Sequence, residues 1–214
     1  MLLASAVYGV NTKASYTNYI TPETDFSGVT VFEKESELLS DGTASTIRTS
    51  KENLLSADII VKVKFSGQRE QVHFATKSMV SVTEVIKGDR LQVGESFYLF
   101  EPSWFGYNPD EKNIYFMRFS RLNIMQKDSE YIVFANEIKY DEEYSKTLKV
   151  KEYIYADRNC PYFMADFTVS EIYTAENSSF PILWGDVGKN EFICCSDYQL
   201  NEMNAYKREI FKEV

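Results

Sequence analysis

Ser56-Ala-Asp-Ile-Ile-Val-Lys-Val-Lys-Phe65 is the stretch of sequence that decides the fold. Apolar residues occupy alternate positions from Ile59 to Phe65, and Lys62 and Lys64 stand between them. A period of two residues places one face of a strand against a core and the other face in water. The stretch therefore predicts a half-buried β-strand, and Ser66-Gly67 after it predicts a turn.

More strands are expected on the C-terminal side of this one. A long alternating run extends from His73 to Ile86. The residues on one of its faces are Phe74, Thr76, Ser78, Val80 and Val82. Long strands of this kind bend around two sides of a small barrel. Shorter strands are expected at 96–101, 130–135, 147–155 and 192–195.

The N-terminal part of the chain has a different character. Residues 1–10 are apolar and uncharged, and Ala4-Ser-Ala6 has the small-residue form of a signal-peptidase site. We therefore interpret residues 1–14 as the remnant of a signal peptide or membrane anchor; the alternative is an N-terminal strand or a disordered leader. The polar residues 15–50 predict an N-terminal arm with a short helical stretch from Glu33 to Leu39.

The C-terminal part predicts a helix that packs on the strands. Ser196-Asp-Tyr-Gln199 has the form of a capping box. The apolar residues that recur after it at helical spacing are Leu200, Met203, Tyr206, Ile210 and Val214. We expect an amphipathic helix at 197–213, within a domain that spans residues 51–214.

Composition favours β structure and disfavours two kinds of partner. The chain contains 15 Phe, 15 Tyr and 2 Trp, and aromatic residues suit pleated, half-buried surfaces. Its net charge is -9, whereas a non-specific nucleic-acid binder needs an excess of Lys and Arg to neutralise phosphates. We expect no nucleic-acid partner and no direct binding of the barrel to a membrane surface, which is anionic.

Residues that would carry catalysis are scarce. His73 is the single histidine, and the chain has neither a nucleophile elbow nor a phosphate-binding glycine loop. Acidic neighbours such as Asp110-Glu111 and Asp141-Glu-Glu143 stand in expected turns, where water solvates them. The sequence therefore predicts a protein that is not an enzyme and that binds no cofactor.

The three cysteines do not form a metal-binding pattern. No C-x-x-C is present among Cys160, Cys194 and Cys195, and one histidine is too few for a Cys/His zinc site. Two interpretations remain open. Cys160 pairs with Cys194 or Cys195 and leaves one thiol over, or all three are buried, unpaired thiols.

Four short motifs carry a resemblance to a known superfamily. They are Ser56-Ala-Asp-Ile-Ile-Val61, Val82-Thr-Glu-Val-Ile-Lys-Gly-Asp89, Gln92-Val-Gly-Glu95 and Lys127-Asp-Ser-Glu-Tyr-Ile-Val-Phe134. In order and spacing they resemble the OB-fold of the netrin-module and tissue-inhibitor-of-metalloproteinase superfamily, closest to its secreted bacterial members of unassigned function. The resemblance implies a mainly-β fold: an OB-type barrel, closed or partly open, with the C-terminal amphipathic helix and the N-terminal arm.

The chain departs from that superfamily at its best understood site. The metalloproteinase inhibitors act through an N-terminal cysteine whose amine and carbonyl chelate zinc, but no cysteine here precedes Cys160. That mechanism is therefore not carried over to this chain.

Residues 102–123 form a long aromatic segment with surplus binding chemistry. Trp, Tyr and Arg are enriched at binding hot spots, and long loops between strands are often functional. The candidate binding residues are Trp104, Phe105, Tyr107, Tyr115 and Arg118. The alternative is that Ile114 to Phe119 form one more strand whose aromatic side chains plug an end of the barrel.

Together these observations predict a non-catalytic binding module. We expect it to be exported or anchored at the cell surface and to engage a protein or a cell-envelope component. The alternatives are a hydrolase that uses carboxylates on the barrel face, a protease inhibitor and an oligonucleotide binder.

Overall fold

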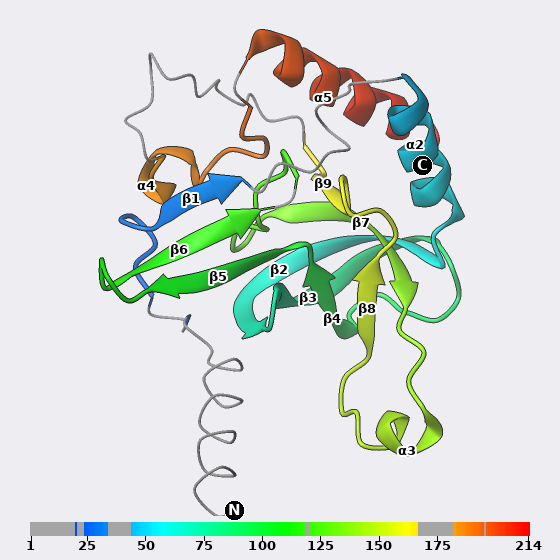
Figure 1. Ribbon diagram of the computed structural model, residues 1–214. Helices are drawn as coiled ribbons and strands as arrows, with labels where there is room; N and C mark the ends of the chain where they lie inside the picture. Colours follow the sequence, from blue (N-terminus) through cyan, green and yellow to red (C-terminus); the bar gives the residue numbers. More distant parts are fainter. Residues whose placement is uncertain (1–19, 21–23, 34–43, 119, 167–181, 195) are drawn as a thin grey trace, which may run out of the picture.

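Five strands close into a barrel in the computed structural model (Figure 1), which describes residues 20, 24–33, 44–118, 120–166, 182–194 and 196–214. The strands are β2 (Ile59–Val72), β3 (Ala75–Lys87), β4 (Ser96–Glu101), β7 (Glu130–Glu137) and β8 (Glu152–Tyr155). They pair in the order β2-β3-β4-β8-β7, and β7 returns to pair with β2. The pairing of β4 with β8 is parallel and the others are antiparallel.

This order identifies the type of barrel. Counted along the chain, the strands run first, second, third, fifth and fourth around the barrel, which is the Greek-key arrangement of an OB-type barrel. The prediction of a mainly-β, OB-type fold with a C-terminal helix is confirmed. A short strand, β9 (Tyr162–Met164), pairs with the first half of β7 beside the barrel.

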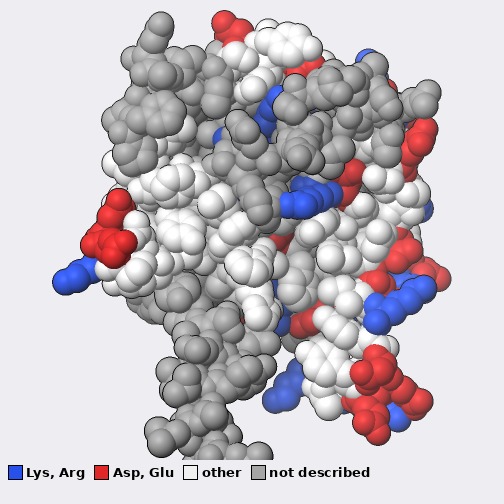
Figure 2. Space-filling view, in the orientation of Figure 1, with Lys and Arg blue, Asp and Glu red and all other residues white. Residues whose placement is uncertain are grey.

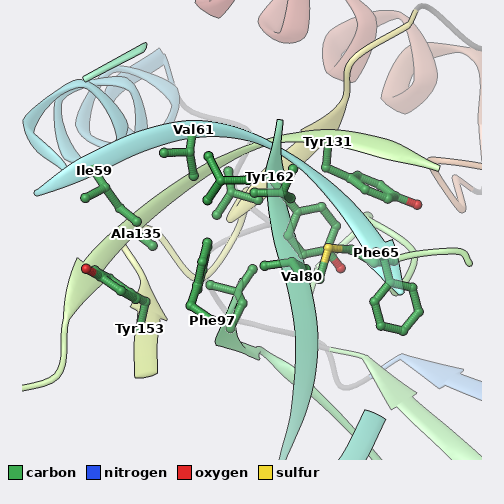
Figure 3. Packing of buried hydrophobic residues seen from close by; sticks show 14 of the residues in the cluster. Ile59, Val61, Phe65, Val80, Phe97, Tyr131, Ala135, Tyr153 and Tyr162 are labelled. Atoms are coloured by element: carbon green, nitrogen blue, oxygen red, sulfur yellow. The ribbon is translucent and has the colours of Figure 1, made fainter. Parts of the chain in front are cut away.

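The alternation in β2 places its apolar face inside the barrel. Ile59, Val61, Val63 and Phe65 are buried, and they pack against Val80, Phe97, Tyr131, Tyr153 and Tyr162 from the other walls (Figure 3). Aromatic rings meet edge to face in this core, as Phe97 and Tyr153 do with 5.1 Å between ring centroids. The large rings from β4, β7 and β8, together with Phe65 at the end of the aliphatic row on β2, fill the barrel.

The turn predicted at Ser66-Gly67 is wrong. β2 continues to Val72, and its register against β3 shifts between Phe65 and Arg69. Gly67 has a φ of 90°, a conformation that favours glycine. The segment is therefore a bulge inside one long strand, and the chain turns back at His73-Phe74 instead.

Two helices pack side by side on the outside of the barrel (Figure 1). α5 (Asp197–Ile210) begins at Ser196, whose Oγ accepts a hydrogen bond from the Gln199 N–H at 3.3 Å. α2 (Ala44–Ser56) contacts it through the Tyr206 hydroxyl, which lies 3.0 Å from Ser50 Oγ. The predicted C-terminal helix is confirmed, and it ends three residues earlier than the predicted 213.

Several predictions from the sequence differ from the structure, and others fall on residues that the structure does not describe. α2 starts in the segment read as a polar arm and crosses residue 50. The strand expected at 147–155 is confined to β8. In the strand expected at 192–195, the described residues include two isolated bridge residues, Phe192, which pairs with Leu122, and Cys194. The leader at 1–14 and residues 34–39 of the helical stretch predicted from Glu33 to Leu39 lie outside the described residues, whereas Glu33 itself is the last residue of a β-strand.

A second, three-stranded sheet stands beside the barrel. It contains β1 (Thr30–Glu33), β5 (Ser103–Asn108) and β6 (Asn113–Arg118) in the order β1-β6-β5, with β1 parallel to β6. One face of this sheet packs on α4 (Trp184–Val187) in a separate apolar cluster. In the described part of the chain, no helix combines the length and the apolar character needed to cross a membrane.

Candidate binding surface

The candidate residues lie on the hairpin formed by β5 and β6, and the hairpin divides them between two faces. Residues directly opposite in a strand pair share a face. Phe105 lies opposite Phe116 on the face that packs inward, and both are buried. Arg118 is also buried, and its Nη1 donates to the Ser120 carbonyl at 2.7 Å. Phe105 and Arg118 are thus part of the interior.

The other predicted residues reach the surface. Trp104 and Tyr115 are half-buried on the outward face of the sheet, and Tyr107 is 42% exposed at the end of β5. The alternative prediction, a strand near Ile114–Phe119, is confirmed by β6. Its inward ring, Phe116, packs in the cluster of the second sheet and not in the barrel core.

The outward side chains form one continuous surface, which we call the aromatic face. It consists of Phe32, Phe74, Trp104, Tyr115 and Met117. Phe74 meets Trp104 edge to face, with ring centroids 5.4 Å apart, and Phe32 meets Tyr115 in the same way at 5.8 Å. Met117 stands between these pairs, opposite Trp104 on β5 and opposite Phe32 on β1.

Gly106 allows the Tyr115 ring to lie flat on β5. A Cβ atom at this position would overlap the Tyr115 ring, because the two residues are direct cross-strand partners. The glycine therefore fixes the position of one ring of the aromatic face.

A hollow lies at the hairpin end of the aromatic face. It has a volume of about 380 Å³ and is lined by Phe32, Tyr107, Asn108, Pro109, Tyr115 and Met117. None of these lining residues is charged. In Figure 2 the surface over β5 and β6 is correspondingly white, and charged residues appear at the tip of the hairpin. The hollow suits an uncharged, apolar group.

Phe74 projects from the opposite end of the aromatic face because of an unusual turn. His73 has a φ of 52°, in the left-handed region that glycine and asparagine adopt most readily. This conformation directs Phe74 outward, with 72% of its surface exposed. The alternation predicts that Phe74 shares a face with Thr76 and Ser78. Thr76 and Ser78 are buried as expected for one face of a strand, but Phe74 belongs to the turn and is exposed.

Sequence reasoning missed Phe32, Phe74 and Met117 as members of this surface. Met117 stands in the aromatic segment, and its alternation with Tyr115 is a usable signal. Phe32 and Phe74 come from distant parts of the chain, and no local pattern links them to Trp104. Only the pairing of β1 with β6 and the length of the β2–β3 hairpin bring them there.

Glu101 is the most conspicuous acid for any catalytic interpretation, and it is fully buried. Its carboxylate lies 3.4 Å from Arg69 Nη2 and accepts from the Met125 N–H at 3.0 Å and the Tyr162 hydroxyl at 2.6 Å. Ser78 Oγ donates to it as well. Burial, together with this carboxylate, raises the pKa of Tyr162 well above its ordinary value. The four partners tie strands β2, β3, β4 and β9 to the loop at Met125.

Two other buried charges are also held by partners within the chain. Lys207 Nζ on α5 lies 2.7 Å from Glu191 Oε2, and the second oxygen of Glu191 accepts from the Met164 N–H at 2.7 Å. Burial lowers the pKa of Lys207, and Glu191 opposes that shift. This ion pair fastens α5 to the edge of β9.

A smaller hollow of about 230 Å³ lies beside the connection from β7 to β8. Glu152 lines it, and this carboxylate accepts from Lys77 Nζ at 2.9 Å and from the Tyr140 hydroxyl at 2.5 Å. Burial and the neighbouring carboxylate raise the pKa of Tyr140. The oxygens of Glu152 are thus engaged by neighbours from β3 and the connection itself.

The cysteines and acids of the described residues form no metal site. Cys160 and Cys194 are buried and are not joined in a disulfide, and the alternative pairing of Cys160 with Cys195 involves a residue outside the described part of the chain. Burial raises the pKa of the Cys160 thiol, which disfavours the reactive thiolate. Within the described part of the chain, no group of three or more His, Cys, Asp or Glu side chains could hold a metal ion.

No protein-family model and no curated protein sequence matches the chain.

Proposed function

We propose that the chain is a non-catalytic binding module that contacts a protein through the aromatic face. The observation that supports this proposal is the combination of exposed rings and an uncharged hollow on the three-stranded sheet and the β2–β3 turn beside it. Phe74 and Phe32 are 72% and 45% exposed, and Tyr107 opens onto the hollow. Exposed apolar patches of contiguous residues are characteristic of interaction sites.

The chemistry of the face favours a polypeptide partner. Aromatic residues dominate the energetic centre of protein interfaces, where charged residues are depleted. Met117 adds an unbranched, adaptable side chain between the rings. Because Phe32, Trp104 and Tyr115 stand on paired strands, these rings lose little conformational freedom when a partner covers them.

A hydrolase that uses carboxylates on the barrel face has weaker support. The buried acids Glu101, Glu152 and Glu191 are each held by internal hydrogen bonds, so their desolvated oxygens already have donors. The proposal also includes export or anchoring at the cell surface. Its support is the sequence pattern at Ala4-Ser-Ala6 alone.

Site-specific photo-cross-linking tests the proposed function. A photoreactive phenylalanine analogue replaces Tyr107 or Trp104 on the aromatic face, and Tyr198 on α5 serves as the matched control because it is an aromatic residue with 66% exposure. In extracts of the native cells, we expect adducts from the two face positions. Adducts from Tyr198 in equal yield, or none from the face positions, would refute the proposal.

A further inference from the structure

The aromatic face carries a projection and a hollow at opposite ends. Phe74 is the projection, and it stands against Trp104. Met117, the cross-strand partner of Trp104, lines the near end of the hollow, and Asn108 and Pro109 line its far end. At the rise of an extended strand, the four residues from Trp104 to Asn108 place the far end of the hollow roughly 13 Å from Trp104.

From this arrangement we infer that the partner of the aromatic face is a second copy of this chain. In a dimer with two-fold symmetry, the same patch on each copy meets the other, so that residue i contacts j and j contacts i. With the symmetry axis between Trp104 and the hollow, Phe74 of each copy enters the hollow of the other. The inference rests on the proposed function, because it uses the same face.

The absence of charged residues from the aromatic face and the hollow lining favours this pairing. Each copy carries a net charge of -9, so two copies repel one another wherever their acids meet. The residues of the aromatic face and of the hollow lining are uncharged. Two acidic molecules can therefore approach on this side without bringing like charges into a desolvated contact.

The two ends of the face are also complementary. Exposed Asp110 and Glu111 lie at the hairpin tip beyond the hollow, next to exposed Lys112, and exposed His73 lies beside Phe74. Two-fold symmetry brings the acids of one copy to the histidine of the other, where an imidazole N–H can donate to a carboxylate. An interface of this kind has aromatic residues at its centre and polar groups at its rim.

Sedimentation equilibrium over a wide protein concentration range tests the inference. We expect the wild-type chain to reach twice its monomer mass and Phe74→Ser to dimerise on the order of 100-fold more weakly, because symmetry removes the contact twice. Tyr198→Ser is the matched control, since it removes an exposed aromatic side chain from α5. It should dimerise as the wild type does. Phe74 is solvent-exposed, so circular dichroism should show Phe74→Ser to be folded.

Disulfide trapping tests the specific geometry. Under mild oxidation, a mixture of Phe74→Cys and Pro109→Cys chains should form a cross-linked dimer. A mixture of Phe74→Cys and Tyr198→Cys should not. The natural Cys160 and Cys194 are buried and should not contribute, and the wild-type chain oxidised in parallel checks the contribution of all three natural cysteines.

The possible failures can be told apart. A chain that stays monomeric, or a dimer that Phe74→Ser does not weaken, overturns self-pairing. If photo-cross-linking at Tyr107 still captures a different protein, the proposed binding function stands and only the self-pairing is overturned. If the face positions yield no adducts of either kind, the proposed function fails as well.

Discussion

Replacement of Glu101 by leucine should strongly destabilise the fold. The carboxylate is fully buried, and it joins Arg69 from β2 to Tyr162 from β9 and to the backbone of Met125. Leucine fills a comparable volume but offers no acceptor. The Arg69 guanidinium, which is largely buried, then loses its counter-charge, and the Met125 N–H loses its hydrogen bond.

The expected loss can be estimated from these contacts. Removing one member of a buried ion pair costs about 3–5 kcal/mol. A buried donor left without an acceptor adds about 1–3 kcal/mol. The Tyr162 hydroxyl adds less, because the Asn123 carbonyl lies 2.9 Å away and can accept its proton instead. We expect a decrease of about 5 kcal/mol in the free energy of unfolding, a large share of the roughly 5–15 kcal/mol typical of a domain.

Denaturation in urea, followed by circular dichroism, measures this loss. Glu84→Leu on the neighbouring β3 is the matched control, because Glu84 is exposed and should change stability by less than about 1 kcal/mol. Arg69→Met combined with Glu101→Leu should recover at least about 2 kcal/mol, since no unpaired charge then remains in the interior. A Glu101→Leu chain within about 1 kcal/mol of wild type would refute the reasoning.

Two further predictions concern buried tyrosines and the aromatic face. Burial raises the pKa of several phenols, among them those of Tyr131, Tyr162 and Tyr206. The folded pKa of each phenol exceeds the unfolded value near 10, so the stabilisation that the protonated phenols give the folded state is complete below pH 10. Above pH 10 the free energy of unfolding falls by about 4 kcal/mol per pH unit for the three phenols together. Phenolate absorbance should therefore rise together with unfolding, and gradual ionisation in the folded state would contradict this. Gly106→Ala should displace the Tyr115 ring and cost about 1–3 kcal/mol in urea denaturation. Gly28→Ala, where a Cβ meets nothing within 4 Å, should cost less; equal losses would contradict the packing argument.

Local sequence patterns predicted the elements that are specified by the spacing of their apolar residues or by the capping residues at their ends. The alternation from Ile59 to Phe65 predicted the first half of β2, because a strand with one apolar face has one stable orientation against a core. Ser196 and Gln199 predicted the start of α5, because the cap satisfies a backbone donor within four residues. The aromatic segment likewise drew attention to Trp104, Tyr107 and Tyr115.

Elements that depend on distant partners were not predictable in this way. The described side chains of α2 include Leu54, which is buried against the barrel and α5; the polar sequence around it indicated an arm. Ser66-Gly67 has the composition of a turn, and the pairing of β2 with β3 on both sides of it makes it a bulge instead.

The sequence by itself determined the strand-forming alternation, the capped C-terminal helix and the aromatic character of residues 102–123. These features follow from interactions between residues a few positions apart. Only the tertiary structure decided that Phe105 and Arg118 turn inward, and that Phe32 and Phe74 join Trp104 and Tyr115 on one surface. The physical reason is that the side of a sheet that reaches solvent depends on what packs against the other side. In this protein the elements that pack against the inner side of the three-stranded sheet are α4 and its neighbours, which lie far from the hairpin in the sequence.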